Sequence, residues 1–220
     1  MADYALARRN MVDAQLRTNK VVAPAVIAAF SDVPRERFVA PQRRPVAYVD
    51  EDLPLGDGRY LMEPMVLARL IQALDLHADD VVLNVGCGSG YSTAILARLA
   101  GTVVAVESDA RLAREANALL TELSVDNAVV VEGPLPGGHA KQAPYNAILV
   151  GGAVTEVSDS LTGQLAEGGR MGVVVDEAGE SGVGRAMLLL KSGGVVSGRP
   201  LFDAATPLLP GFQKEMGFVF

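Results

Sequence analysis

The chain has 220 residues, half of them hydrophobic, with 23 glycines and a formal net charge of −7. This length suits one sizeable α/β domain, and the composition is that of a folded chain and not of a disordered one. The acidic balance argues against a nucleic-acid partner, because the chain has no general attraction to phosphate backbones. The single cysteine, Cys87, excludes an internal disulfide. With no apolar signal-peptide core and no apolar run of roughly 18 to 20 residues, we expect a cytoplasmic protein without a membrane partner.

The first 74 residues predict helices on either side of an irregular stretch. Apolar residues at helical spacing predict two short helices, over residues 3–17 and 23–31. Residues 34–60 are rich in Pro, Arg and Asp and are expected to be extended and loop-like. Pro64 suits the first position of a third helix, whose apolar face runs on to Leu74.

Strands and helices then alternate along the chain. Short apolar runs predict strands over residues 81–85, 102–107, 128–131, 145–150 and 170–175. Helices are expected over 91–99, after a cap at Ser108, and over 155–165, the last closed by Gly168 and Gly169. This alternation indicates an α/β fold with a doubly wound parallel sheet, covered on both faces. We expect one domain over residues 1–220, with residues 1–60 packed on it, and an antiparallel terminal hairpin built from 186–191 and 215–220.

A glycine-rich turn is the most informative segment of the chain. It runs Gly86-Cys87-Gly88-Ser89-Gly90, directly after a predicted strand and before a predicted helix. A dinucleotide fingerprint would need a glycine at position 91, where the chain has tyrosine, so the Gly-x-Gly-x-Gly spacing fits an S-adenosylmethionine loop better. Glu107 ends the next predicted strand and can accept hydrogen bonds from both hydroxyls of a ribose. The alternative is a tight structural turn without a ligand.

The cysteine and the histidines carry little chemistry in the sequence. A nucleophilic Cys87 would need a nearby general base, and the only histidines, His77 and His139, fall in predicted turns. One cysteine and two scattered histidines also give no metal-ligand cluster, so we expect no metal site.

A series of sequence blocks is spread over residues 10 to 180. They are residues 11–17 (MVDAQLR), 33–39 (VPRERFV), 47–48, 53–56 (LPLG), 85–91, 106–107, 143–145 and 165–170. In order and spacing these blocks resemble the protein-L-isoaspartate O-methyltransferase family. The resemblance implies a class I methyltransferase, a Rossmann-like doubly wound sheet with an N-terminal helical segment and an antiparallel C-terminal strand. It implies S-adenosylmethionine as the cofactor, held by residues 86–90, Glu107, Gly133 and Pro134. It also implies a protein or peptide substrate with isoaspartyl residues.

The chemistry that the resemblance implies is methyl transfer to a carboxylate during protein repair. A carboxylate is already ionised at neutral pH, so the reaction needs no general base. The enzyme holds the carboxylate oxygen in line with the sulfonium methyl, and proximity and orientation supply much of the acceleration.

Departures from the family pattern gather at the expected acceptor pocket. Where the family usually carries Gln-Thr-Ile-Ser-Gln-Pro, residues 59–64 read Arg-Tyr-Leu-Met-Glu-Pro. The active-site serine of the family therefore falls on Met62, its threonine on Tyr60 and its second glutamine on Glu63. Met62 cannot donate a hydrogen bond to a carboxylate, and Glu63 would repel one.

The expected cofactor side departs as well. Asn84 replaces an acidic residue two positions before the first loop glycine, and Gly151-Gly152-Ala153 replaces Thr-Ala-Ala. Pro134 replaces the aspartate that contacts the adenine amino group in the family. Each lost polar contact costs about 1 kcal/mol or more of binding, so we expect weakened cofactor binding.

Three interpretations therefore stay open. The first is a carboxyl methyltransferase of the isoaspartyl repair type. The second is a divergent, non-catalytic relative that acts as a binding protein. The third is a methyltransferase for a different acceptor, cationic or neutral, which Glu63 would favour.

The C-terminal tail is too apolar to stay solvated. Its apolar residues include Leu208, Leu209, Phe212, Met216, Phe218 and Phe220. Three prolines between residues 200 and 210 favour an extended path over a helix. Either residues 216–220 add an antiparallel strand to the sheet, or the tail docks on a partner or a second copy.

Overall fold

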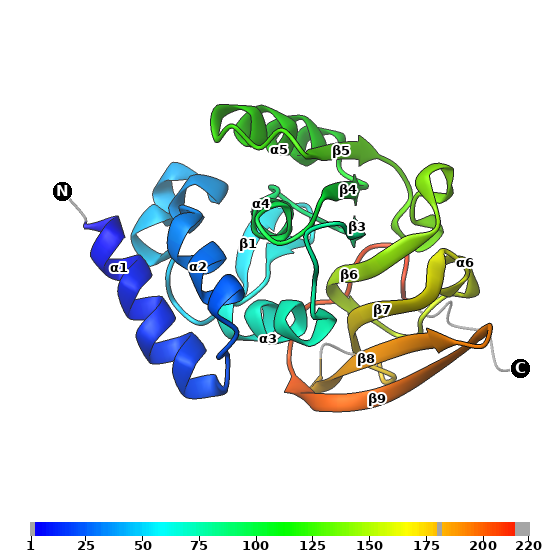
Figure 1. Cartoon of the computed structure of the whole chain (residues 1–220). Coiled ribbons are helices and arrows are strands. Elements are labelled where there is room, and N and C mark those ends of the chain that lie inside the picture. Colours follow the sequence, from blue (N-terminus) through cyan, green and yellow to red (C-terminus); the bar gives the residue numbers. More distant parts are fainter. Residues whose placement is uncertain (1–2, 180–181, 214–220) are drawn as a thin grey trace, which may run out of the picture.

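The computed structural model describes residues 3–179 and 182–213, and a twisted sheet forms their centre (Figure 1). Its seven strands lie in the order β5-β4-β3-β6-β7-β8-β9. The first five of these are parallel, and β8 and β9 extend the sheet as an antiparallel hairpin. The bounds are β3 (Val81–Val85), β4 (Thr102–Glu107), β5 (Ala128–Glu132), β6 (Tyr145–Val154), β7 (Leu165–Val175), β8 (Gly184–Ser192) and β9 (Val195–Ala204).

Helices and a small hairpin surround this sheet. The helices are α1 (Tyr4–Met11), α2 (Pro24–Asp32), α3 (Pro64–Leu74), α4 (Tyr91–Ala97), α5 (Ala110–Glu122) and α6 (Asp159–Gly163). The separate two-stranded hairpin is β1 (Leu53–Gly56) and β2 (Arg59–Leu61). Shorter helical turns cover Val12–Leu16, Arg17–Asn19, Arg35–Phe38, Pro41–Val46, Leu135–Gly137 and Ala140–Gln142.

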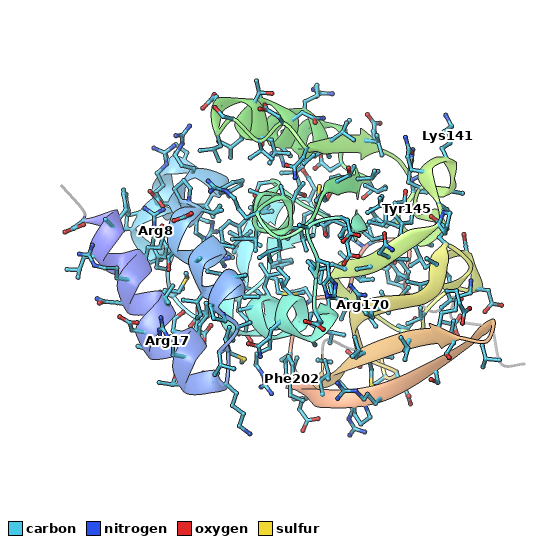
Figure 2. All side chains as sticks on the ribbon, viewed as in Figure 1. Arg8, Arg17, Lys141, Tyr145, Arg170 and Phe202 are labelled. Atoms are coloured by element: carbon cyan, nitrogen blue, oxygen red, sulfur yellow. The ribbon has the colours of Figure 1, made fainter. Side chains whose placement is uncertain are left out.

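The N-terminal segment packs on the helical side of the sheet. Asp3 caps α1 by accepting a hydrogen bond from the Leu6 backbone N–H at 2.9 Å. Met11 and Phe30 are buried in the same apolar cluster as Leu70 of α3. The side chain of Arg69, also on α3, lies 3.6 Å from the ring centroid of Phe202 on β9. Figure 2 shows Phe202 beneath α3, where this contact ties the C-terminal hairpin to the helical layer.

The two faces of the sheet are covered differently. Alternate strand residues point to opposite faces, so Val82 belongs to one apolar cluster and Leu83 to the other. Buried residues of α3, α4 and α5 cover the first face. On the second face, the short helix α6 contributes Leu161, and Leu209 and Phe212 come from the segment after β9. That segment therefore covers a part of the second face that the short helix α6 does not cover.

The structure confirms most predicted elements. Strands β3 and β4 have the predicted bounds, α3 begins at Pro64, and the sheet is the predicted parallel α/β sheet with an antiparallel C-terminal strand. Among the described residues, no helix is long and apolar enough to cross a membrane.

Several predictions about local structure were wrong. Residues 34–60 are not only loop, because they include two helical turns and the strand β1. The cap of α5 is Asp109 and not Ser108, since its carboxylate accepts hydrogen bonds from two backbone N–H groups of the first turn. The predicted helix over 155–165 shrinks to α6, because Leu165 already pairs with Tyr145 as part of β7.

The terminal hairpin has a different second strand from the predicted one. Strand β8 pairs with β9, across the Gly193-Gly194 turn. Both glycines have positive φ, +60° and +78°, a conformation that favours glycine at both positions of such a turn. The predicted strand over residues 215–220 lies outside the described residues.

Candidate active site

The glycine turn lies between β3 and α4, at the carboxyl end of the parallel strands. Gly86, Gly88 and Gly90 have φ values of +73°, +56° and +93°, which residues with a side chain rarely adopt. The Gly86 and Cys87 backbone N–H groups both donate to the Val106 carbonyl, at 2.8 and 3.3 Å. The turn is therefore fixed against the end of β4, which is the edge where open α/β sheets bind ligands.

Glu107, the last residue of β4, faces this turn and is fully buried. Its carboxylate accepts hydrogen bonds from the backbone N–H groups of Gly88 (2.6 Å), Ser108 (2.8 Å) and Asp109 (3.1 Å). Burial opposes ionisation, but the Arg59 guanidinium and these backbone donors outweigh it and hold the pKa of Glu107 below its ordinary value. The carboxylate is thus ionised and held in place, as a ribose-binding group requires.

Arg59 reaches the same carboxylate from β2 and forms a two-pronged ion pair with it. Its Nε lies 3.0 Å from Oε1 of Glu107, and its Nη2 lies 2.9 Å from Oε2. The Arg59 side chain is only 3% exposed. The pair joins residues 48 positions apart in the sequence. Arg59 was visible in the sequence as a departure from the family block, but nothing there indicated that it would bind the predicted ribose carboxylate.

The segment after β9 lies against the carboxyl end of β6, and its Leu209 lies beside Gly86 and Arg59. The Ala153 N–H donates to the Pro207 carbonyl (2.9 Å), and the Leu209 N–H donates back to the Ala153 carbonyl (2.8 Å). The Thr155 hydroxyl donates to the Phe212 carbonyl at 2.6 Å. These bonds hold the segment against β6.

Leu209 fills the space next to the glycine turn. It is 1% exposed. A Cβ placed on Gly86 would lie 2.9 Å from Leu209 Cδ2 and 3.1 Å from Arg59 Nη2, and one on Gly152 would lie 2.8 Å from Leu209. The only sequence signal was that Leu209 and Phe212 are too apolar to remain solvated, and their burial confirms that expectation.

Other residues of the predicted cofactor site already have partners within the chain. The Ser89 hydroxyl donates to the Phe38 carbonyl at 2.6 Å, so it fastens the N-terminal segment to the turn. Burial raises the pKa of the Cys87 thiol, and the nearby Glu107 adds to the effect, which argues against a nucleophilic cysteine. Asn84 is directed into the protein, where its amide donates to the Ser92 and Thr93 hydroxyls at 2.8 and 2.9 Å.

Gly133 and Pro134 follow β5 at the same edge of the sheet. The Gly133 N–H donates to the Glu107 backbone carbonyl at 3.0 Å, which brings the two predicted cofactor positions together. Pro134 is exposed and begins the turn Leu135–Gly137. It offers no side-chain acceptor at this position.

The predicted acceptor residues lie around the start of α3. Met62 is buried, Glu63 is half-buried, and Tyr60 is 36% exposed. Tyr60 alternates with Arg59 along β2, so its side chain points to the other side of that strand. The structure therefore does not place Tyr60 beside the Arg59–Glu107 pair.

Carboxylates surround the start of α3. The Glu63 N–H donates to Asp52 Oδ1 at 2.9 Å, and the Met65 N–H donates to Asp50 Oδ1 at 3.1 Å. Burial, together with Asp52 and Asp50, raises the pKa of Glu63 to about 7. Asp52 also accepts a hydrogen bond from the Thr206 hydroxyl at 3.3 Å, so this region is connected to the segment that carries Leu209.

The chemistry of these groups fits S-adenosylmethionine, but Arg59 and Leu209 already contact them in this conformation. Glu107 and the glycine turn have the chemistry to hold a ribose and to let a ligand approach the backbone closely. Both Glu107 oxygens are bound to Arg59, and Leu209 lies against Gly86.

The sheet order and the carboxylate at the end of β4 define the class as Rossmann-like, class I methyltransferase. A model of the family described as Protein-L-isoaspartate(D-aspartate) O-methyltransferase (PCMT) matches residues 7–198. The chain therefore belongs to this methyltransferase family, which confirms the resemblance seen in the sequence and the prediction of a methyltransferase.

Individual relatives agree with this assignment. Relatives named protein-L-isoaspartate O-methyltransferase are 39% identical over 175 residues in Koribacter versatilis (80% of this chain, 79% of the relative) and 40% identical over 168 residues in Methanoregula boonei (76% and 77%). A solved structure of the same name has a TM-score of 0.81 at 25% identity and covers 94% of this chain and 67% of its own. A Plasmodium falciparum structure, solved with S-adenosyl-L-homocysteine, has a TM-score of 0.77 at 18% identity, covers 95% and 99%, and shares the fold.

Proposed function

We propose that this chain is an S-adenosylmethionine-dependent carboxyl methyltransferase that acts on isoaspartyl residues of proteins or peptides. The observation that carries the proposal is the ionised Glu107 carboxylate at the end of β4, held against the Gly86–Gly90 turn by backbone donors. Family membership supports both the cofactor and the reaction. The cofactor supplies the methyl group when bound.

Each group of residues in the site would have a separate role. Glu107 would accept hydrogen bonds from the ribose hydroxyls once Arg59 has moved away. The backbone of the glycine turn would lie against the ligand, because a side chain at Gly86 would close that approach. Met62 and Glu63 would border the acceptor, and no proton needs to be removed from an ionised carboxylate before transfer.

A methyl-transfer assay tests this function directly. The full chain would be incubated with S-adenosylmethionine carrying a labelled methyl group and an isoaspartyl peptide, and the matched control would be the same peptide with a normal aspartyl residue. Labelling of the isoaspartyl peptide alone is expected. Glu107→Ala should lower incorporation, because it removes the ribose acceptor. Equal, background labelling of both peptides at saturating cofactor would contradict the proposal.

A second candidate function, binding without catalysis, is favoured by one specific observation. Side chains of the chain itself already contact the groups assigned to the cofactor, because Arg59 is bound to Glu107 and Leu209 lies against Gly86. A folded chain that gives no calorimetric signal with millimolar S-adenosylmethionine, and none after this position is opened by mutation, would favour this second function.

A further inference from the structure

We propose that Arg59 and residues 206–212 together form an internal inhibitor of the cofactor site, and that the cofactor binds only when both are displaced. Residues 206–212 are called the closing segment below. The inference rests on the proposed function, because it assigns a regulatory state to the same site.

The first part of the inhibitor acts by charge. A ribose needs the two oxygens of Glu107 as acceptors, and the Arg59 guanidinium binds one oxygen through Nε and the other through Nη2, at 3.0 and 2.9 Å. Both side chains are almost fully buried, at 3% and 0% exposed. Planar pairing of this kind occupies both oxygens of the carboxylate at once. Arg59 therefore competes with the cofactor for one group.

The second part acts by shape. Leu209 of the closing segment lies against both Gly86 and Gly152, close enough that a Cβ on either glycine would meet it at 2.9 or 2.8 Å. The glycines that would let a ligand approach the backbone are thus covered by an apolar side chain. Leu209 and Arg59 Nη2 are both next to Gly86, so the two parts of the inhibitor close one space.

Both parts lie outside the main sheet, so they can move without breaking it. Arg59 belongs to the β1–β2 hairpin, a separate two-stranded sheet. The closing segment follows the last strand and is held by its backbone bonds to Ala153, by Thr155 and by the Thr206–Asp52 contact. Segments held by few bonds open locally at a lower free energy than the whole fold. A ligand that binds only the open state then has its affinity reduced by the fraction of molecules that are open.

Calorimetric titration of the full chain with S-adenosyl-L-homocysteine tests the proposal. Arg59→Gln restores the residue that the family usually carries, and Leu209→Ala shortens the side chain that covers Gly86. Each variant is expected to bind at least about tenfold more tightly than the wild type, because each raises the open fraction. If Leu209→Ala fails to fold, Leu209→Val makes the same test with a smaller change.

Two control variants remove similar groups from β7, toward the amino ends of the parallel strands. Arg170 donates to the Leu74 carbonyl at 2.7 Å and pairs with Asp80 at 2.6 Å, and Figure 2 shows it beside the end of α3. Arg170→Gln therefore removes an ion-paired arginine far from the glycine turn. Leu165→Ala removes a leucine as buried as Leu209. Both controls are expected to keep the wild-type affinity.

Hydrogen exchange supplies a readout that does not depend on activity. The Leu209 amide is protected by its bond to the Ala153 carbonyl. Saturating S-adenosyl-L-homocysteine should speed exchange at this amide in the wild type, because the closing segment must leave.

The outcomes separate the regulatory proposal from the proposed function. Wild-type affinity equal to that of both variants, with Leu209 still protected in the complex, would overturn the internal inhibitor and leave the methyltransferase function standing. No binding by the wild type or by any folded variant would overturn cofactor use itself, and the inhibitor with it. Tighter binding by the controls as well would show a general loosening of the fold, which also overturns the proposal.

Discussion

Replacing Arg59 by methionine should destabilise the protein strongly and in a pH-dependent way. The change leaves the fully buried Glu107 carboxylate without its ion-pair partner. Breaking a buried pair from one side typically costs roughly 3 to 5 kcal/mol. Three backbone N–H groups still bind Glu107, from Gly88, Ser108 and Asp109, so we expect the lower end, about 3 kcal/mol at pH 7.5.

The pH dependence follows from the depressed pKa of Glu107. Burial raises this pKa, but Arg59 and the backbone donors together outweigh burial and lower it. A carboxyl with a depressed folded-state pKa contributes stability above its unfolded pKa, and that contribution is lost as pH falls through the folded value. Without Arg59 the pKa should rise, so Glu107 folds protonated in mild acid. The difference in unfolding free energy between wild type and variant should therefore be smaller at pH 4.5 than at pH 7.5.

Urea denaturation at the two pH values measures this difference. Arg98→Met is the control, because both side chains of its ion pair with Asp32 are exposed, and its cost should be smaller and nearly constant over the same range. A cost for Arg59→Met below about 1 kcal/mol at pH 7.5, or one that does not change with pH, would refute the view that Arg59 is what stabilises the buried carboxylate.

Three further predictions concern the same region. The pKa of Glu63 is raised to about 7. Its contribution to stability is therefore complete below its unfolded pKa and is lost as pH rises through 7. The wild-type melting temperature should fall between pH 5.5 and 8 by more than that of Glu63→Gln. Leu209→Ala should cost roughly 2 to 5 kcal/mol in urea denaturation, and Leu208→Ala, at a half-buried neighbour, clearly less. Changing Tyr60→Thr, Met62→Ser and Glu63→Gln together should raise labelling of isoaspartyl peptides; no gain in a folded, cofactor-binding triple variant would show that these positions do not explain the divergence.

The parts of the fold that the sequence predicted correctly depend on local pattern. Strands β3 and β4 are short apolar runs with clear ends, and the glycine turn between β3 and α4 has backbone angles that demand glycine. Helix α6 was predicted too long, since the apolar spacing over 155–165 resembles a helix. Pairing of Leu165 with Tyr145 across an irregular register ends that helix early, and such pairing is not visible in one segment alone.

The state of the candidate site could not be predicted, because it depends on contacts between distant segments. Glu107 and the turn were identified from their spacing, whereas the partner of Glu107 lies 48 positions earlier in the sequence, in a separate hairpin. Leu209 was expected to be buried, but an apolar residue carries no signal that says which surface buries it. Only the three-dimensional arrangement shows that both residues meet at Gly86.

The departures from the family pattern gain a common physical meaning from this arrangement. Methionine at position 62 and proline at position 134 each lack a polar group that could bind a ligand, so we expect the site to attract substrate and cofactor less strongly. Arg59 and Leu209 do more, because they supply hydrogen-bond donors to Glu107 and apolar volume beside Gly86, where the proposed cofactor would otherwise bind. A buried, ionised Glu107 with neither Arg59 nor a bound ribose beside it would destabilise the folded state. The chain can thus keep Glu107 in place when little cofactor is bound. The free energy that stabilises the closed state is the same free energy that a cofactor must overcome to bind.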